Sequence, residues 1–262
     1  MVKRLGCAGL EIGLGDDILV VDLFEDASPL EPFVGEARTA LPGPTQPHAA
    51  AAALVTHLHS DHTDPAAIAR ALRPDGVVLR PGPGSGQGLE IAGMAVAEAG
   101  LAELGLEQRH LEWWDEVRIG PFAITAVPAV DGFGDPQLSW VIEAGGIRLF
   151  HGGDTLFHGW WWPIAQRCGP IDIAFLPVNG PVVDLPHRQP PHRLPAAMDP
   201  TQAATAAFVM RARLAVAIHY DTFHAPTYEQ VDRPPEQFAE AAAKLAVPTA
   251  ILEPGEVVDL TR

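Results

Sequence analysis

Four side chains able to bind a metal ion occur within six residues of this sequence: His57, His59, Asp61 and His62. They follow the apolar run Ala53–Val55 and precede Asp64-Pro65, the pattern of a helix N-cap followed by proline. Because side chains alternate along a strand, we expect His57 and His59 on one face, and the turn then brings the other two donors to the same pocket. Imidazole and carboxylate hold zinc and similar divalent ions, so this segment predicts a metal site between a strand and a helix.

Short apolar runs rich in β-branched residues recur along the chain, bounded by glycine, proline and aspartate, and indicate strands. These runs are Ile18–Val21, Ala53–Thr56, Gly76–Leu79, Phe122–Val127, Leu138–Ile142, Ile147–Phe150, Ile171–Leu176 and Leu214–Ile218. The stretches between them that favour helix are 64–72, 85–104, 199–213 and 235–246. Two segments rich in proline, 36–50 and 180–198, are expected to be loops. The alternation of strands and helices predicts an α/β fold.

Composition excludes several classes of function. The chain has 262 residues with 17 basic and 33 acidic side chains, a formal net charge of −16. This balance argues against a nucleic-acid partner and against an anionic membrane surface. No apolar run approaches the ~18 residues of a membrane span, so no membrane insertion is expected. Two distant cysteines, Cys7 and Cys168, and the lack of a signal-peptide pattern favour a reducing compartment, and we expect a cytoplasmic protein.

The H-x-H-x-D-H run resembles the signature of the metallo-β-lactamase superfamily of metallohydrolases. Two later segments extend the resemblance in the order that this family has. Gly152–Thr155 is similar to the family's G-D-T/S turn, and His219, after the strand at 214–218, is similar to its final histidine ligand. The match covers nearly the whole chain. It implies one domain, residues 1–262, built as a four-layer αβ/βα sandwich of two mixed sheets flanked by helices.

One subgroup of this family is more similar to the chain than the rest. The similar segments are Leu5–Gly9, Val20–Asp22, Trp113–Val117, Val127–Val130, Gly152–Thr155, Met198–Pro200 and His219–Phe223. The subgroup contains L-ascorbate 6-phosphate lactonases and N-acylphosphatidylethanolamine-hydrolysing phospholipase D. The resemblance therefore implies hydrolysis of a phosphodiester, lactone or ester in a small molecule, and nothing points to a β-lactam substrate.

The resemblance also implies a centre with two divalent metal ions. The implied ligands are His57, His59 and Asp131 for the first ion, Asp61, His62 and His219 for the second, and Asp154 between the two. Zinc is the usual ion for such donors, and manganese or iron becomes favourable as carboxylates replace imidazoles.

Two positions depart from the subgroup's pattern. Asp131 stands where the third histidine ligand of the first ion is usual, and Cys7 stands where the opening motif has histidine. With Asp131, the three carboxylates contribute −3 against +4 from two divalent ions, so a bound hydroxide makes the centre neutral. Because less net positive charge then stabilises the hydroxide, we expect the pKa of the metal-bound water to be somewhat higher. Aspartate reaches less far than histidine, which leaves a displaced, water-bridged or absent first ion as alternatives. Cys7 is expected to be a small buried residue.

These features predict a metal-dependent hydrolase whose nucleophile is a metal-bound hydroxide. Asp61 is expected to serve in catalysis as well as in metal binding, and His224 to contact the substrate or protonate its leaving group. Asp22 is expected to support a ligand from behind, whereas His151 either does the same or bonds to the backbone. The three tryptophans at 160–162 form either an aromatic wall for the substrate, which we favour, or a cap on the core.

Two other functions compete with this prediction. A protein of the same fold that has lost catalytic activity and binds a ligand or partner would explain Asp131, although six of the seven expected ligands remain. A nuclease of the same superfamily is disfavoured by the acidic charge and by the lack of a basic run. The charge favours a small-molecule substrate, and the sequence gives no indication of the oligomeric state.

Overall fold

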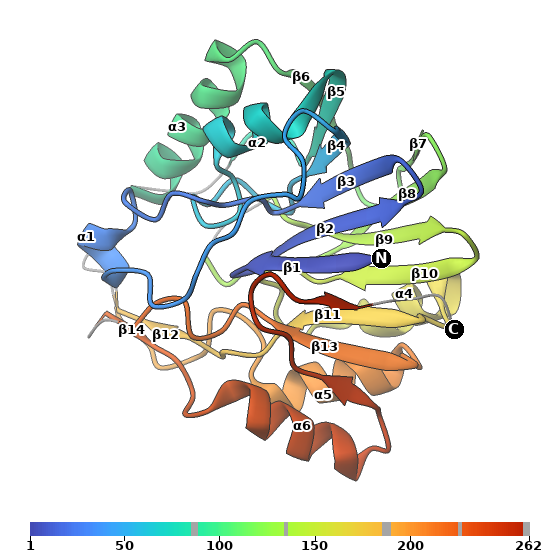
Figure 1. Ribbon diagram of the computed structural model, residues 1–262. Coiled ribbons are helices and arrows are strands. Elements are labelled where there is room, and N and C mark those ends of the chain that lie inside the picture. The colour runs from blue at the N-terminus through green and yellow to red at the C-terminus, as the bar shows by residue number, and fades with distance from the viewer. Residues whose placement is uncertain (85–88, 134–135, 185–189, 225–226, 259–262) are drawn as a thin grey trace.

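The computed structural model describes residues 1–84, 89–133, 136–184, 190–224 and 227–258. Two mixed sheets of seven strands each lie face to face, with helices over both outer faces (Figure 1). This arrangement is the four-layer αβ/βα sandwich that the family resemblance implied.

The first sheet joins an antiparallel half to a parallel half. Its order is β16 (Val257–Val258), β1 (Val2–Gly6), β2 (Gly9–Leu14), β3 (Asp17–Val21), β4 (Ala50–Leu54), β5 (Leu72–Arg80) and β6 (Glu107–His110). Pairing is antiparallel from β16 to β3 and parallel from β3 to β6. The helices on its outer face are α2 (Pro65–Ala71) and α3 (Leu89–Glu103) (Figure 1).

The second sheet is parallel at one side and antiparallel at the other. Its order is β15 (Thr249–Ala250), β13 (Leu214–Ile218), β11 (Ile173–Pro177), β10 (Ile147–His151), β9 (Leu138–Ala144), β8 (Phe122–Pro128) and β7 (Glu116–Ile119). Strands β15, β13, β11 and β10 are parallel, and β10 to β7 are antiparallel. The helices on its outer side are α4 (Trp161–Cys168), α5 (Pro200–Val209) and α6 (Pro234–Lys244).

Two small elements lie beyond one end of the sheets (Figure 1). The one-turn helix α1 (Glu31–Val34) was not predicted from the sequence. The strands β12 (Val182–Val183) and β14 (Tyr228–Glu229) form an antiparallel ribbon. β12 interrupts the predicted loop at 180–198, of which 185–189 lie outside the described residues. No regular element interrupts 36–49, in agreement with the other predicted loop.

Apolar side chains from both sheets fill the space between them. The largest of these include Leu10, Leu19, Leu79, Phe122, Trp140 and Phe175, all buried. Each such burial contributes roughly 1.5–3 kcal/mol relative to exposure. The opposite faces of the strands pack under the helices, as Val20 and Val78 do against Ile68 and Leu101. Strands covered on both faces have continuous apolar runs, which is the pattern that identified them in the sequence.

Aspartate before proline starts two helices as predicted. Asp64 Oδ1 accepts a hydrogen bond from the Ala67 backbone N–H at 2.9 Å at the start of α2. Asp199 and Gln202 form a capping box at the start of α5. The sequence-based end of that helix, Arg213, was wrong. The helix stops at Val209 because Arg211 adopts a left-handed conformation, with φ of 54°.

Strand alternation does not place His57 and His59, contrary to the expectation from sequence. β4 ends at Leu54, and the histidines lie in the turn that follows it. Leu58, between them, is buried in the apolar cluster beneath α2. The two histidines project together because the residue between them is anchored in the core.

None of the helices in the described parts of the chain is long and apolar enough to cross a membrane.

Asp64 ties α2 to the preceding loop as well as capping it, because its Oδ2 accepts from the backbone N–H groups of Glu25 and Asp26, both at 3.2 Å. We expect Asp64→Ala to lower the free energy of unfolding by about 2 kcal/mol, since it loses the cap and the loop anchor. Asp199→Ala, the matched control, should cost only about 1 kcal/mol. Urea unfolding of the metal-free protein measures both, and equal losses would contradict the anchoring role.

Candidate metal centre

The carboxyl ends of four strands position the predicted metal ligands at one end of the sandwich. The turn from His57 to His62 follows β4 in the first sheet. Asp131, Asp154 and His219 follow β8, β10 and β13 in the second sheet. Residues far apart in sequence therefore converge, and they form two groups of donor atoms.

The first cluster consists of His57, His59 and Asp131. His57 Nε2 lies 2.9 Å from His59 Nδ1. Asp131 Oδ2 lies 3.7 Å from the His57 nitrogen and 3.6 Å from the His59 nitrogen. Although an aspartate side chain is shorter than a histidine side chain, the Asp131 carboxylate therefore lies close to both imidazoles.

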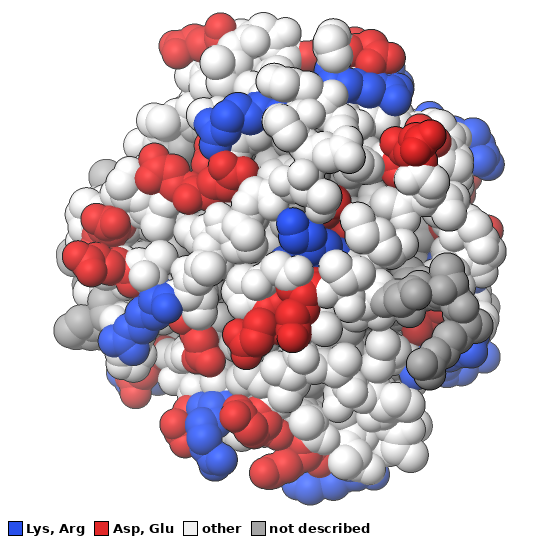
Figure 2. Space-filling view, in the orientation of Figure 1, with Lys and Arg blue, Asp and Glu red and all other residues white. Residues whose placement is uncertain are grey.

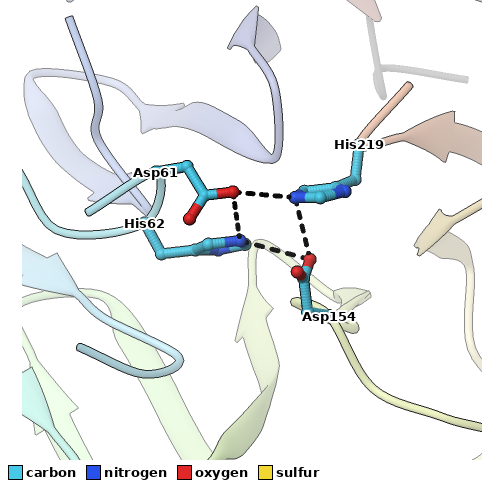
Figure 3. Close-up of side chains that lie close together, drawn as sticks. All are labelled: Asp61, His62, Asp154 and His219. Carbon is cyan, nitrogen blue, oxygen red and sulfur yellow. Dashed lines mark hydrogen bonds and ion pairs between the residues drawn. The ribbon is translucent and has the colours of Figure 1, made fainter. Parts of the chain in front are cut away.

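The second cluster consists of Asp61, His62, Asp154 and His219, which point toward one another in Figure 3. His219 Nε2 lies 3.2 Å from Asp61 Oδ2 and 3.1 Å from Asp154 Oδ1. His62 Nε2 lies 3.2 Å from the same Asp154 oxygen and 3.7 Å from Asp61 Oδ2. Two imidazole nitrogens and two carboxylate oxygens thus face a common centre.

A buried carboxylate behind the second cluster holds His62 in place. Asp22 Oδ2 accepts from His62 Nδ1 at 2.7 Å and from Thr56 Oγ1 at 2.8 Å, and Oδ1 accepts from the Thr56 backbone N–H. Because the Nδ1–H of His62 donates a hydrogen bond to Asp22, Nε2 is the ring nitrogen that faces the cluster. The support by Asp22 was predicted. The role of Thr56 in holding Asp22 was not predicted from the sequence, although Thr56 lies directly before the first histidine.

The charges of the second cluster stabilise one another in the metal-free protein. Burial lowers the pKa of His62, but the carboxylates of Asp154, Asp22 and Asp61 outweigh it and raise that pKa well above its ordinary value. Burial likewise lowers the pKa of His219, and its neighbours, Asp154 foremost and Asp61 among them, more than compensate, so the pKa is again raised. Burial raises the pKa of Asp61, but His62 and His219 outweigh it, so this pKa is lowered. Protonated imidazoles therefore stand between ionised carboxylates.

The first cluster has the opposite balance. Burial raises the pKa of Asp131 to about 6. Burial also lowers the pKa of His57 well below its ordinary value, and the neighbouring His62 lowers it further. A carboxylate and a neutral imidazole buried together lack the positive charge that a metal ion would supply.

The donors fit divalent metal ions. Within the described residues, the buried Asp131 Oδ2 has no hydrogen-bond partner. Leaving a buried polar atom without a partner costs about 1–3 kcal/mol. The atoms of each cluster lie within 4.8 Å of one another, and imidazole with carboxylate is a donor set for zinc, iron and manganese. The two clusters together supply seven such donors.

His224 lies apart from both clusters. Its side chain is exposed and lines a cavity of about 240 Å³ with Arg38, Thr39, Asp221, Phe223 and Gln230. No interaction found among the described residues joins His224 to a candidate metal ligand. Phe223 and Gln230 also line a smaller pocket that contains His219, so the two regions adjoin.

Two residues beside His219, Asn179 and Tyr228, were not identified from the sequence. Cys7, Asn179 and Tyr228 line the pocket beside His219, and Asn179 Nδ2 donates to Tyr228 Oη at 2.7 Å. Cys7 is buried, as predicted, and its carbonyl accepts from the His219 backbone N–H at 3.0 Å. Burial raises the pKa of the Tyr228 hydroxyl, which stays neutral. Single tyrosine and asparagine residues carry no spacing pattern that could have marked them.

The three adjacent tryptophans divide between core and surface. Trp161 is fully buried and stacks with Phe157 and His158, whereas Trp160 and Trp162 are exposed. Trp160 also meets Trp113, with ring centroids 5.4 Å apart. The prediction of an aromatic wall was therefore wrong for Trp161, which belongs to the core.

His151 bonds to the backbone. Its Nε2 donates to the Ala8 carbonyl at 2.8 Å, and its Nδ1 accepts from the Gly153 backbone N–H at 3.2 Å. Of the two roles left open from sequence, the structure supports the backbone role.

A sequence model of the β-lactamase superfamily domain matches residues 19–220, about three quarters of the chain. A UPF0173 metal-dependent hydrolase of Thermococcus onnurineus is 27% identical, over 99% of both chains. Another of that name, from Anaeromyxobacter, is 30% identical over 78% of this chain and 69% of its own.

Solved structures with the same fold are more distant in sequence. Igni18, a metallo hydrolase of Ignicoccus hospitalis, superimposes with a TM-score of 0.67 at 18% identity, over 98% of this chain and 96% of its own. This likeness supports the description of the fold.

The raised pKa values of His62 and His219 make metal binding compete with protons. The neighbouring carboxylates favour the protonated form of both imidazoles in the metal-free protein, and each must lose a proton to bind a metal through Nε2. We expect zinc binding to release about two protons per chain and to tighten as the pH rises toward these pKa values. Calorimetric titration in two buffers of different ionisation enthalpy measures the release. Identical heats in both buffers would contradict it.

Proposed function

The chain belongs to the β-lactamase superfamily, and we propose that it is a metal-dependent hydrolase of small molecules with a phosphodiester, lactone or ester bond. The observation that carries this proposal is the pair of adjacent donor clusters at one end of the sandwich. The names of its relatives, metal-dependent hydrolases, agree with it.

In this proposal the clusters hold two divalent cations. The first cluster, His57, His59 and Asp131, would bind one ion, and the second cluster, Asp61, His62, Asp154 and His219, would bind the other. The chemistry that such cations supply is a water of lowered pKa and a positive charge for the oxyanion that develops. Three carboxylates among the seven donors favour manganese or iron beside zinc.

The chain's own residues would orient the reactants. Asp22 and Thr56 fix His62 so that its Nε2 stays on the cluster. Asp61 offers Oδ2 to His62 and His219, and we assign its Oδ1, for which no contact is found among the described residues, as acceptor of a proton from the attacking water. His224 would meet the leaving group from the adjoining cavity and give it a proton.

The surface charge favours a small substrate. The net charge of −16 repels polyanions. On the face shown in Figure 2, basic side chains lie apart from one another, most of them beside acidic ones. A continuous basic path for a nucleic acid backbone is not present on that face, which disfavours a nuclease.

A hydrolysis assay with three probes tests the proposal. We expect the chain loaded with zinc or manganese to hydrolyse at least one of bis(p-nitrophenyl) phosphate, a γ-lactone and p-nitrophenyl acetate. Asp154→Asn should lower that rate about a hundredfold or more, because it removes a charge shared by two imidazoles. If the loaded chain hydrolyses none of them, the result would favour a binding protein that has lost its chemistry.

His224 has a separate test with a matched control. We expect His224→Ala to lower kcat/KM on the best probe by roughly a hundredfold, the usual contribution of a general acid. His192→Ala removes another exposed histidine, whose Nδ1 accepts the Leu194 backbone N–H, and should leave kcat/KM unchanged. Equal values for the two variants would exclude His224 from the reaction.

A further inference from the structure

Tyr228 places a hydroxyl group beside the second cluster. It lies in β14, which pairs with β12 in the ribbon beyond one end of the sheets (Figure 1). Its side chain lines the same pocket as His219. The charges of His219, Asp154 and Asp61 act on the hydroxyl, and these are three of the four residues in the second cluster. The ribbon therefore brings a polar group to the candidate metal centre from outside both sheets.

Packing fixes the ring of Tyr228. The side chain is only 9% exposed and belongs to an apolar cluster with Cys7 and Phe223. The Phe223 ring meets it edge to face, with ring centroids 6.3 Å apart. The chain after β14 is tied to the end of β11, because the Val231 N–H donates to the Asn179 carbonyl at 2.9 Å. A buried ring held in this way keeps its hydroxyl at one place in the pocket.

The hydroxyl receives a hydrogen bond but has no acceptor for its own proton. Asn179 Nδ2 donates to Tyr228 Oη at 2.7 Å, and no acceptor of the Tyr228 O–H is found within the described residues. A buried donor without an acceptor costs about 1–3 kcal/mol. Because the Asn179 amide occupies one lone pair of Oη, the proton is directed away from that amide. The O–H is thus ready to donate to a group that enters the pocket.

The surroundings also keep this proton on the oxygen. Burial raises the pKa of the Tyr228 hydroxyl, and the carboxylates of Asp154 and Asp61 raise it further, against the opposite effect of His219. A neutral phenol donates a hydrogen bond but does not act as a base. The chemistry open to this group is therefore hydrogen-bond donation.

We propose that Tyr228 is a catalytic residue, whose hydroxyl donates a hydrogen bond to the substrate oxygen on which negative charge develops. In the hydrolysis of a lactone, ester or phosphodiester, that oxygen is the carbonyl or a phosphoryl oxygen. The hydroxyl acts by a hydrogen bond alone, so no bond to Tyr228 forms and its proton stays in place. Such a bond accelerates the reaction because it is stronger in the transition state than in the bound substrate. The inference rests on the proposed function, since it assigns a further residue to the same site.

The chain has two tyrosines, and the other provides a matched control. Tyr220 is also buried and lines the same pocket, but its hydroxyl accepts from Arg4 and donates to the Leu252 carbonyl. We expect Tyr228→Phe to lower kcat on the best probe by roughly 10- to 100-fold, the size of one hydrogen bond to a charged oxygen, with KM within about threefold. Tyr220→Phe should keep kcat within about twofold, because its proton already has an acceptor.

Phosphate binding gives a second measurement that needs no turnover. Inorganic phosphate offers charged oxygens that accept hydrogen bonds as the transition state does. In calorimetric titration of the metal-loaded protein, Tyr228→Phe should weaken phosphate binding about tenfold, and Tyr220→Phe should leave it unchanged. Metal analysis and thermal unfolding establish that each variant is loaded and folded.

The inference is overturned if Tyr228→Phe and Tyr220→Phe agree both in kcat and in phosphate affinity, the result expected if the Tyr228 proton went to the Asn179 amide oxygen. A chain that hydrolyses the probes and shows this agreement retains the proposed function and loses the inference. A chain that hydrolyses none of them, but whose phosphate binding depends on Tyr228, loses the proposed function and retains Tyr228 as the donor to a bound oxyanion.

Discussion

The balance of buried charge at the ends of β4, β8, β10 and β13 is the constraint on which the remaining features depend. Three carboxylates, Asp61, Asp131 and Asp154, lie among four imidazoles with little access to water. Without metal, protons on His62 and His219 balance the second cluster, whereas in the first cluster the pKa of Asp131 rises to about 6. In the proposed function, two divalent cations would satisfy all of these groups at once, because they would supply positive charge and bind every donor atom.

The apolar layers of the sandwich hold these buried charged groups in place. Each sheet is buried on both faces, so the apolar layers fix the strand ends from which the donors project. A layer of hydrogen bonds then orients the side chains: Asp22 and Thr56 behind His62, and the Phe133 N–H behind Asp131. Such support keeps the donors together before an ion arrives, which lowers the cost of binding it.

The central strands could be predicted from the sequence, because strands buried on both faces leave apolar runs, and aspartate before proline marks helix starts. The four layers were expected only from the family resemblance. Candidate metal ligands close together in the sequence, such as His57 and His59, were identifiable from their own spacing. Asp131 was identified only through a family resemblance, since its partners come from another sheet. The alternation argument for the histidines was wrong because β4 ends at Leu54. Contacts that depend on tertiary packing, such as those of Tyr228, leave no local pattern.

The central claim is that seven side chains from both sheets form one centre for two metal ions. The most direct test is the metal content per chain, measured by elemental analysis on protein purified without a chelating column and after incubation with zinc, manganese or iron(II). The account predicts about two divalent ions per chain. One ion would contradict the part assigned to the Asp131 cluster. None after incubation with all three metals would contradict the metal centre itself.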